Sequence, residues 1–317
     1  MSNKSLLLHI GLQKTGSRTL QRALFFNHPQ VHYLGKVEVN NSIKRGCVDD
    51  KTYRLLKSIL WDLEKPMNTE STLSLLNETL LPLISEDQVL VGSWESLASQ
   101  GIKHHHEMLN RTQSIFGGCR IMITLRNPIF QIPSLYLQNL QGNFLGRQKI
   151  RMRYRSNIDI ETWYKMRLAE KNSSLLNYSD CIRKSIEQLG RENVGVFLFE
   201  ELKENPKAYY QSICKFMGID SDIGASLTQD EHFNIRLSEM QVTYMHEIHS
   251  SFFKRGLNAL LSRKSRRKGF SARAGGSSAK AVLPDHLIKE VSNASREGHR
   301  WLVEKLDLPL EKYGYPL

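Results

Sequence analysis

The chain has 317 residues, 40% hydrophobic and 24% charged, so it is long enough to bury a core and has an ordinary globular composition. Its 44 Lys and Arg outnumber 32 Asp and Glu, and the net charge of +12 favours an anionic partner without selecting one class. The cysteines form no CxxC pair and the opening apolar run is only Leu6–Ile10, which argues against a zinc knuckle, a signal peptide or a transmembrane segment and predicts a cytoplasmic protein.

Short apolar runs alternate along the chain with longer helical patterns. Strands are predicted at Ser5–Ile10, Gln88–Val91, Arg120–Leu125 and Val194–Phe199. Helices are predicted from Ser17 to Phe26 and over residues 52–63, 72–84, 103–116, 129–140, 160–170, 180–189 and 285–306. Strands separated by helices predict an α/β fold with a parallel sheet covered on both faces, and the carboxyl ends of its strands form the ligand-binding edge.

The part of the chain after about residue 200 is predicted to be mostly helical. Residues 262–280 (SRKSRRKGFSARAGGSSAK) are the exception, because a basic stretch rich in Gly and Ser is typical of a flexible loop. The sequence contains no internal repeat and no clear linker, so we predict one domain over residues 1–317.

The first predicted strand runs directly into a glycine-containing turn and then a helix. Backbone N–H groups in the first turn of a helix are free to bind an anion, and the helix dipole favours negative charge there. Gly16 permits a close backbone approach, Ser17 and Thr19 can add hydroxyl donors, and Lys14 supplies a cation. The segment therefore predicts a P-loop-like phosphate site, although an incidental strand–helix turn has the same local pattern.

Two other classes of protein fit parts of this pattern. In a nucleotide kinase or NTPase, the P-loop lysine follows the second glycine directly, whereas here Lys14 precedes Gly16 by two residues. A non-enzymatic nucleic-acid-binding protein would explain the positive charge, but the sequence has no recognition motif and its cations are not interleaved with stacking aromatic residues. Both remain as alternatives, and we expect no nucleic-acid partner.

Residues 9–21 (HIGLQKTGSRTLQ) resemble the 5′-phosphosulfate loop of the PAPS-dependent sulfotransferase family, here of the bacterial type, where PAPS is 3′-phosphoadenylyl sulfate. Gln13 stands in place of a proline and Arg18 in place of a small hydroxyl residue. The resemblance implies a sulfotransferase that uses PAPS as co-substrate, releases PAP and needs no metal. It also implies that the donor is held by Gln13, Lys14, Thr15, Gly16, Ser17, Arg18 and Thr19.

A second element of that family binds the 3′-phosphate of the donor through an Arg at a strand end and a Ser eight residues later. Arg126 directly follows the strand RIMITL, and Ser134 lies eight residues beyond it. The planar guanidinium of arginine suits phosphate oxygens. A third marker, Phe199-Glu200-Glu201-Leu202, has Phe199 where the family has tyrosine.

The family takes the proton of the acceptor hydroxyl with a His or Glu. Glu95 follows the strand at Gln88–Val91 and is the first candidate for this base, and Glu38 is the alternative. A helix cap or an ion pair would also explain Glu95. Lys14 is predicted to stabilise charge on the leaving phosphate, which makes it catalytic as well as donor-binding.

The late basic stretch contains Arg267-Lys268-Gly269, which resembles the triplet that closes over the 3′-phosphate in cytosolic sulfotransferases. We therefore expect residues 262–280 to act as a lid over the donor. The acceptor is expected to be a small molecule or a glycan with a hydroxyl group, and the basic surroundings favour a carbohydrate or another polar, anionic molecule. The sequence does not indicate the oligomeric state.

Overall fold

The computed structural model describes residues 4–35, 46–99, 101–145, 158–169, 176, 178–229 and 237–317. Five strands form one sheet in the order β2-β3-β1-β4-β5, and every neighbouring pair is parallel. Their bounds are β1 (Leu6–His9), β2 (Val31–Tyr33), β3 (Val89–Ser93), β4 (Cys119–Leu125) and β5 (Val194–Leu198). The predicted parallel α/β fold is confirmed, and all four predicted strands are present.

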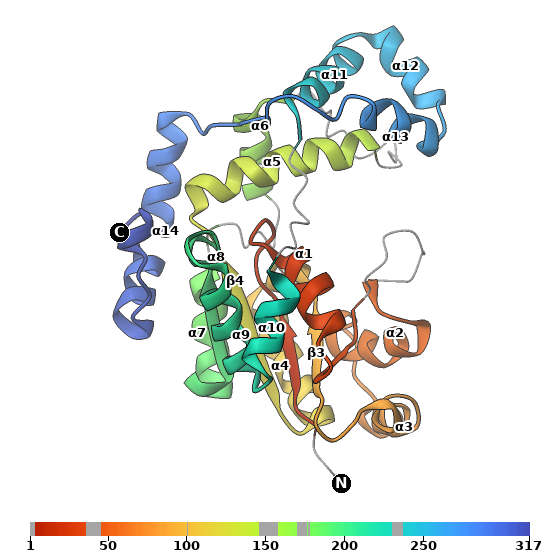
Figure 1. The fold of residues 1–317 in the computed structure, drawn as a ribbon, viewed down its shortest axis with the longest axis vertical. Helices are drawn as coiled ribbons and strands as arrows, with labels where there is room; N and C mark the ends of the chain where they lie inside the picture. Colours follow the sequence, from red (N-terminus) through yellow and green to blue (C-terminus); the bar gives the residue numbers. More distant parts are fainter. Residues whose placement is uncertain are drawn as a thin grey trace.

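The sheet is buried on both faces. Leu6 and Leu8 of the central strand β1 point into one core, while Leu7 points into the other, as the two-residue period of a strand requires. The first core is completed by α2 (Asp50–Leu56), α3 (Thr69–Thr79), α4 (Ile102–Phe116) and α7 (Tyr178–Leu189), and the second by the helical turn η1 (Leu20–Phe25) and by α9 (Pro206–Met217) (Figure 1). The unbroken hydrophobic run Leu6–Leu8 is therefore what a strand covered on both faces requires.

The helices follow the predicted order. Those before the fifth strand are α1 (Ser17–Thr19), η1 (Leu20–Phe25), α2 (Asp50–Leu56), η3 (Lys57–Trp61), α3 (Thr69–Thr79), η4 (Leu81–Leu83), η5 (Glu95–Ser99), α4 (Ile102–Phe116), α5 (Pro128–Leu145), α6 (Ile160–Leu168), α7 (Tyr178–Leu189) and η6 (Arg191–Asn193). Those after it are α8 (Phe199–Glu204), α9 (Pro206–Met217), α10 (Ser221–Thr228), α11 (Glu239–Ser250), α12 (Phe252–Leu260), α13 (Arg263–Ser271), α14 (Asp285–Leu306) and η7 (Glu311–Tyr313).

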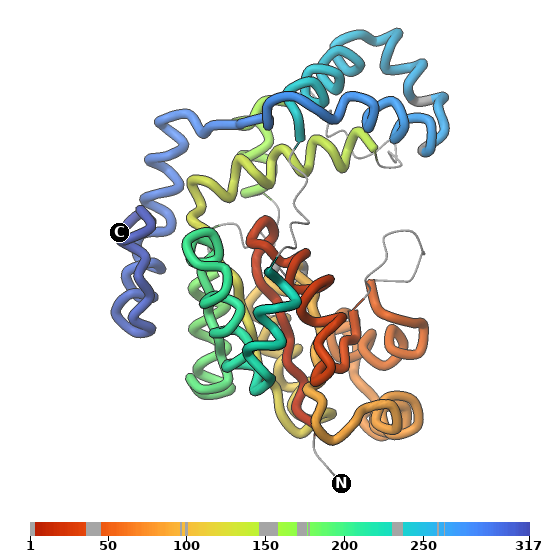
Figure 2. Tube along the Cα trace, in the orientation of Figure 1, coloured from red at the N-terminus to blue at the C-terminus, as the bar shows by residue number. Residues whose placement is uncertain are grey.

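A third core lies beyond the carboxyl edge of the sheet. Helix α5 crosses above this edge, and α6, α11, α13 and α14 pack against it (Figure 1). The segment that joins α13 to α14 runs back along α5 (Figure 2). The edge at which parallel strands place their ligands is thus covered by a helical layer, which creates enclosed space there.

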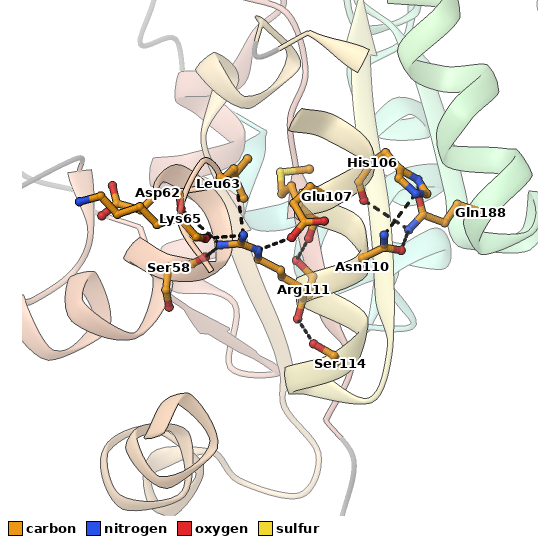
Figure 3. A network of polar contacts seen from close by, with 12 residues as sticks. Ser58, Asp62, Leu63, Lys65, His106, Glu107, Asn110, Arg111, Ser114 and Gln188 are labelled. Atoms are coloured by element: carbon orange, nitrogen blue, oxygen red, sulfur yellow. Dashed lines mark hydrogen bonds and ion pairs between the residues drawn. The ribbon is translucent and has the colours of Figure 1, made fainter. Parts of the chain in front are cut away.

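Arg111 connects α4 to the neighbouring η3 segment through hydrogen bonds. Its Nη1 donates to the carbonyl oxygens of Ser58 at 2.6 Å and Asp62 at 3.3 Å, and its Nε pairs with Glu107 at 2.6 Å (Figure 3). The guanidinium is buried, and these hydrogen bonds replace the ones to water that it loses. This network holds α4, the first long helix after Glu95, in place.

The prediction of a loop over residues 262–280 is wrong in its first half. Helix α13 begins after Ser262, whose hydroxyl accepts the N–H of Ser265 at 3.1 Å as an N-cap. Phe270 near its end is buried in the third core and anchors the helix.

None of the described helices is long and apolar enough to cross a membrane.

Candidate active site

The turn between β1 and α1 has a strained backbone. Lys14 has a φ of 69° and Gly16 a φ of 84°, so both occupy the left-handed region, which is costly for a residue with a side chain. A Cβ at Gly16 would also lie 2.9 Å from Cδ2 of Leu202, so a side chain there would force Leu202 to move. Strain of this kind at a non-glycine residue is typical of functional turns, since the surrounding structure must hold it.

A buried polar network lies beneath this turn. The hydroxyl of Thr15 donates to the carbonyl oxygen of Leu12 at 2.5 Å and shares a hydrogen bond of 2.6 Å with Thr124. His9 Nδ1 lies 2.7 Å from Ser93 Oγ, and its Nε2 lies 3.2 Å from Thr124 Oγ1. Burial lowers the pKa of His9 to about 3, so the ring is neutral and joins the ends of β1, β3 and β4.

Glu95 lies beside the turn, two residues after the end of β3. Ser17 of the first helical turn donates a hydrogen bond to its Oε1. Burial raises the pKa of Glu95 to about 7, although the positive charges of Arg18 and Lys14 act to lower it. A carboxyl group with such a pKa is ionised in a large fraction of molecules at neutral pH and remains basic enough to accept a proton.

Arg126 brings the second predicted element to the same turn. It follows β4, and its Nη1 donates to the carbonyl oxygen of Lys14 at 3.2 Å. Its guanidinium lies 4.9 Å from the ring centroid of Phe199, and the ammonium of Lys203 lies 5.0 Å from the same ring. Phe199, at the position where the family has tyrosine, thus supports the arginine through a cation–π contact. Gln131 of α5 adds a hydrogen bond of 2.9 Å from its Nε2 to the carbonyl oxygen of Gln13.

A cavity of about 400 Å³ opens on one side of the turn and is lined by residues of α5 and of the segment that precedes α14. Three cationic residues contribute to its wall, namely Lys14, Arg126 and Lys280, together with the hydroxyl residue Ser134. The rest of the wall consists of Ile129, Phe130, Pro133, Leu137, Gln138, Gln141, Phe199, Leu237, Ala279, Ala281, Val282, Leu283 and Ile288. We call this space the cationic cavity.

A smaller cavity of about 290 Å³ opens on the other side of the turn. It is lined by Gln13, Gln21, Tyr33, Gly46, Ser93, Trp94 and Glu95. Gln21 reaches the polar network beneath the turn, because its Nε2 donates to Ser93 Oγ at 3.0 Å. We call this space the carboxyl cavity.

The chain terminus supports the cationic cavity in a way that the motifs alone did not predict. The backbone N–H of Asn127 donates to Glu200 at 3.1 Å, and its Nδ2 donates to the carbonyl oxygen of Gly314 at 2.9 Å. The hydroxyl of Tyr315 donates to the second oxygen of Glu200 at 2.9 Å. The residue after Arg126 is therefore tied to both α8 and the tail, which fixes the direction of the arginine.

The predicted residues fall into three groups. The first group meets at one edge of the sheet and consists of the turn residues together with Arg126, Ser134 and Glu95. Within the turn, however, the side chain of Arg18 is exposed and that of Thr19 hydrogen-bonds Tyr210. Within the part of the chain that the structure describes, Arg267, Lys268 and Gly269 line neither cavity, and lie on α13 beyond the far end of α5 (Figure 1). Glu38 lies outside the described residues.

Comparison with known proteins defines the class of this enzyme. A family model described as the sulfotransferase domain matches residues 4–295, so the chain belongs to the sulfotransferase family. This confirms the class expected from the sequence, a PAPS-dependent sulfotransferase.

No curated protein matches the sequence. Similar solved structures include the sulfotransferase of Alicyclobacillus acidocaldarius, with 14% identity, a TM-score of 0.46 and coverage of 82% of this chain and 98% of that one. Another is a mouse sulfotransferase complexed with PAP, with 13% identity, a TM-score of 0.44 and coverage of 95% and 89%. At these identities and TM-scores the comparisons with single structures add no detail of the site.

Proposed function

We propose that this protein transfers the sulfuryl group of PAPS to a hydroxyl group of a polar acceptor, in line and between the two cavities. The observation that carries the proposal is that one turn, residues 13–18, has cations on one side and a carboxyl group of raised pKa on the other. In the reaction, the bond between sulfur and the bridging oxygen of the donor breaks as the acceptor oxygen bonds to sulfur. The acceptor proton passes to Glu95. The two products are PAP and the sulfate ester of the acceptor.

The cationic cavity suits the donor. Its volume of about 400 Å³ lies in the range of small-molecule sites, and Lys14, Arg126 and Lys280 supply positive charge for two phosphate groups. We assign Arg126 and Ser134 to the 3′-phosphate and the turn to the 5′-phosphosulfate, as the family resemblance implies. Lys14 is assigned to the bridging oxygen, where negative charge develops as sulfur leaves. Lys280 takes the lid position that the sequence suggested for Arg267 and Lys268.

The carboxyl cavity suits a polyhydroxylated acceptor. Its wall offers the amides of Gln13 and Gln21, the hydroxyls of Tyr33 and Ser93 and the indole of Trp94. Groups that donate and accept hydrogen bonds beside an aromatic ring recognise sugars well, because hydroxyls need partners when they lose water. We therefore propose a carbohydrate or a similar polar molecule as the acceptor.

Calorimetry with PAP tests the donor half of this proposal. We expect Lys14→Ala and Arg126→Ala each to weaken PAP binding at least tenfold, because each removes a charged partner of a phosphate. Lys215→Ala is the matched control, since Lys215 is an exposed cation at the end of α9, next to the start of β4 rather than its carboxyl end. Equal affinity in all four proteins, or no binding of PAP to the wild type, would overturn the donor assignment.

A turnover assay with PAPS and a panel of hydroxyl acceptors tests the catalytic half. Glu95→Gln and Glu38→Gln are compared, with Glu86→Gln as the control because Glu86 is exposed in the turn before β3, away from the edge that carries Glu95. We expect only Glu95→Gln to reduce kcat strongly while PAP affinity is retained. Loss of activity in Glu38→Gln with an active Glu95→Gln would transfer the role of base to Glu38.

A further inference from the structure

Helix α12 presents an apolar face to solvent. Phe252 and Leu260 are each 84% exposed and Phe253 is 73% exposed, which is unusual for side chains of this size. Leu257 and Leu261 are also exposed. Contiguous exposed apolar side chains of this kind mark an interaction surface.

The arrangement of α12 is the reverse of that of an ordinary surface helix. At 100° per residue, Phe252, Phe253, Leu257 and Leu260 fall within one half of the helix circumference. The side that packs against the protein carries Asn258, which is only 7% exposed. A helix of a water-facing protein normally places its apolar side inward, so the sequence of α12 fits a second, non-aqueous environment.

Cations surround this apolar face. Residues 248–284 contain no Asp or Glu, and their Lys and Arg residues are Lys254, Arg255, Arg263, Lys264, Arg266, Arg267, Lys268, Arg273 and Lys280. The guanidinium of Arg255 lies 5.4 Å from the ring centroid of Phe252, so charge lies directly beside the apolar surface. Helix α13, which follows, has five Lys and Arg among its first six residues.

The surface is firmly attached to the domain and projects from it. Phe270 of α13 and Phe144 of α5 are buried with ring centroids 5.8 Å apart, and His249 of α11 lies 5.6 Å from Phe144. Figure 1 shows α11, α12 and α13 extending beyond the end of α5 that is far from β4. Arg126 lies just before the other end of α5 and Ser134 lies within its first half, so α5 connects the projecting surface to the cationic cavity.

We propose that α12 and α13 bind the surface of an anionic lipid bilayer. The apolar side chains of α12 enter the boundary between headgroups and acyl chains, and the cations of α12 and α13 contact lipid phosphates. A second copy of this chain suits the surface less well, because two copies would bring cationic segments without a single acid against each other. Binding of this kind would hold the enzyme at a membrane and give it access to acceptors at that surface.

Vesicle co-sedimentation of the full chain tests the proposal. The probes are vesicles of phosphatidylcholine alone and vesicles that also contain phosphatidylglycerol. We expect binding to the anionic vesicles that weakens with salt, and at least a tenfold loss in Phe252→Ser/Phe253→Ser, because apolar insertion is removed. A similar loss is expected in Lys254→Glu/Lys264→Glu, in which two exposed cations are reversed.

Matched controls keep the test independent of folding. Leu83→Ser changes a side chain that is 63% exposed in η4, outside the surface, and should bind vesicles like the wild type. Lys207→Glu/Lys215→Glu reverses two exposed cations of α9 and should do the same. PAP affinity, measured on every variant, should be unchanged, since none of these residues lines either cavity among those described.

Three results would overturn the proposal. The first is vesicle binding that survives Phe252→Ser/Phe253→Ser, since the attraction would then be only electrostatic. The second is equal binding to neutral and anionic vesicles. The third is the absence of binding to the anionic vesicles. A dimer in size-exclusion chromatography that the serine variant converts to a monomer would then assign the surface to a second copy.

Discussion

The cationic cavity and the carboxyl cavity are both lined by residues of one turn, but their walls differ in charge. Lys14 lines the first together with Arg126 and Lys280, whereas the preceding residue, Gln13, lines the second together with Glu95. Two consecutive residues thus serve opposite sides, with the backbone of Lys14 in the left-handed region. Sulfuryl transfer needs positive charge where the phosphate leaves and a base where the hydroxyl arrives, and the turn separates these requirements in space.

The largest expected effect is on the carboxyl side. Glu95→Gln removes the proposed base, and we expect kcat to fall about 10²- to 10⁴-fold. Since burial raises the pKa of Glu95 to about 7, the carboxyl group becomes protonated as the pH falls below that value and can no longer accept a proton. The kcat/KM of the wild type should therefore fall about tenfold per pH unit below about 7.

The measurement is a pH–rate profile of both proteins with the same acceptor. The residual activity of Glu95→Gln should lack the acidic limb. An acidic limb that persists in Glu95→Gln would assign the titration, and the role of base, to another group.

The next effect concerns the cationic side. Lys280→Ala should weaken PAP binding about five- to tenfold, because an exposed cation contributes less to phosphate binding than a buried one. Arg267→Ala/Lys268→Ala removes two charges from α13 and should change the affinity less than twofold. Calorimetry at two salt concentrations measures the PAP affinity of both variants. A larger loss in Arg267→Ala/Lys268→Ala than in Lys280→Ala would assign the lid role to Arg267 and Lys268 instead.

The contrast between Lys280 and the α13 triplet shows where sequence reasoning reaches its limit. The turn at Lys14 and the arginine after β4 were predictable, because each is defined by a strand, a local motif and a fixed spacing. Helix α13 was not, because its basic, Gly- and Ser-containing sequence has the composition of a loop and Phe270 is its one large apolar residue. Lys280 reaches the cavity through the path of the chain back along α5, which no local pattern encodes.

Other elements were missed for related reasons. Strand β2 has only three residues, Val31–Tyr33, which is too short for a strand period to be recognised. Asn127 is buried beside a strand end, and its partners at Gly314 and Glu200 are distant in the sequence. The motif Phe199-Glu200-Glu201-Leu202 and the tail could each be noticed, but their contact arises only in the folded chain.

A smaller effect is expected at Phe199. Phe199→Leu keeps an apolar side chain but removes the aromatic face beneath Arg126. We expect PAP affinity to fall about three- to tenfold, which corresponds to a cation–π contact, while the acidic limb at about pH 7 stays in place. Phe199→Tyr keeps the ring and should retain the affinity, and a loss in Phe199→Tyr equal to that in Phe199→Leu would exclude the cation–π explanation.

The smallest effect separates the two roles of Lys14, its charge and its backbone. Lys14→Ala and Lys14→Gly both remove the ammonium group, so both should lose turnover to the same extent. Glycine adopts a φ of 69° without strain, whereas alanine does not, and Lys14→Gly should be about 1 kcal/mol more stable than Lys14→Ala. Urea unfolding measures the difference. The control position is Lys289, which is exposed in the interior of α14. There Lys289→Gly should be about 1 kcal/mol less stable than Lys289→Ala. Opposite signs of the difference at the two positions would identify backbone strain in the turn.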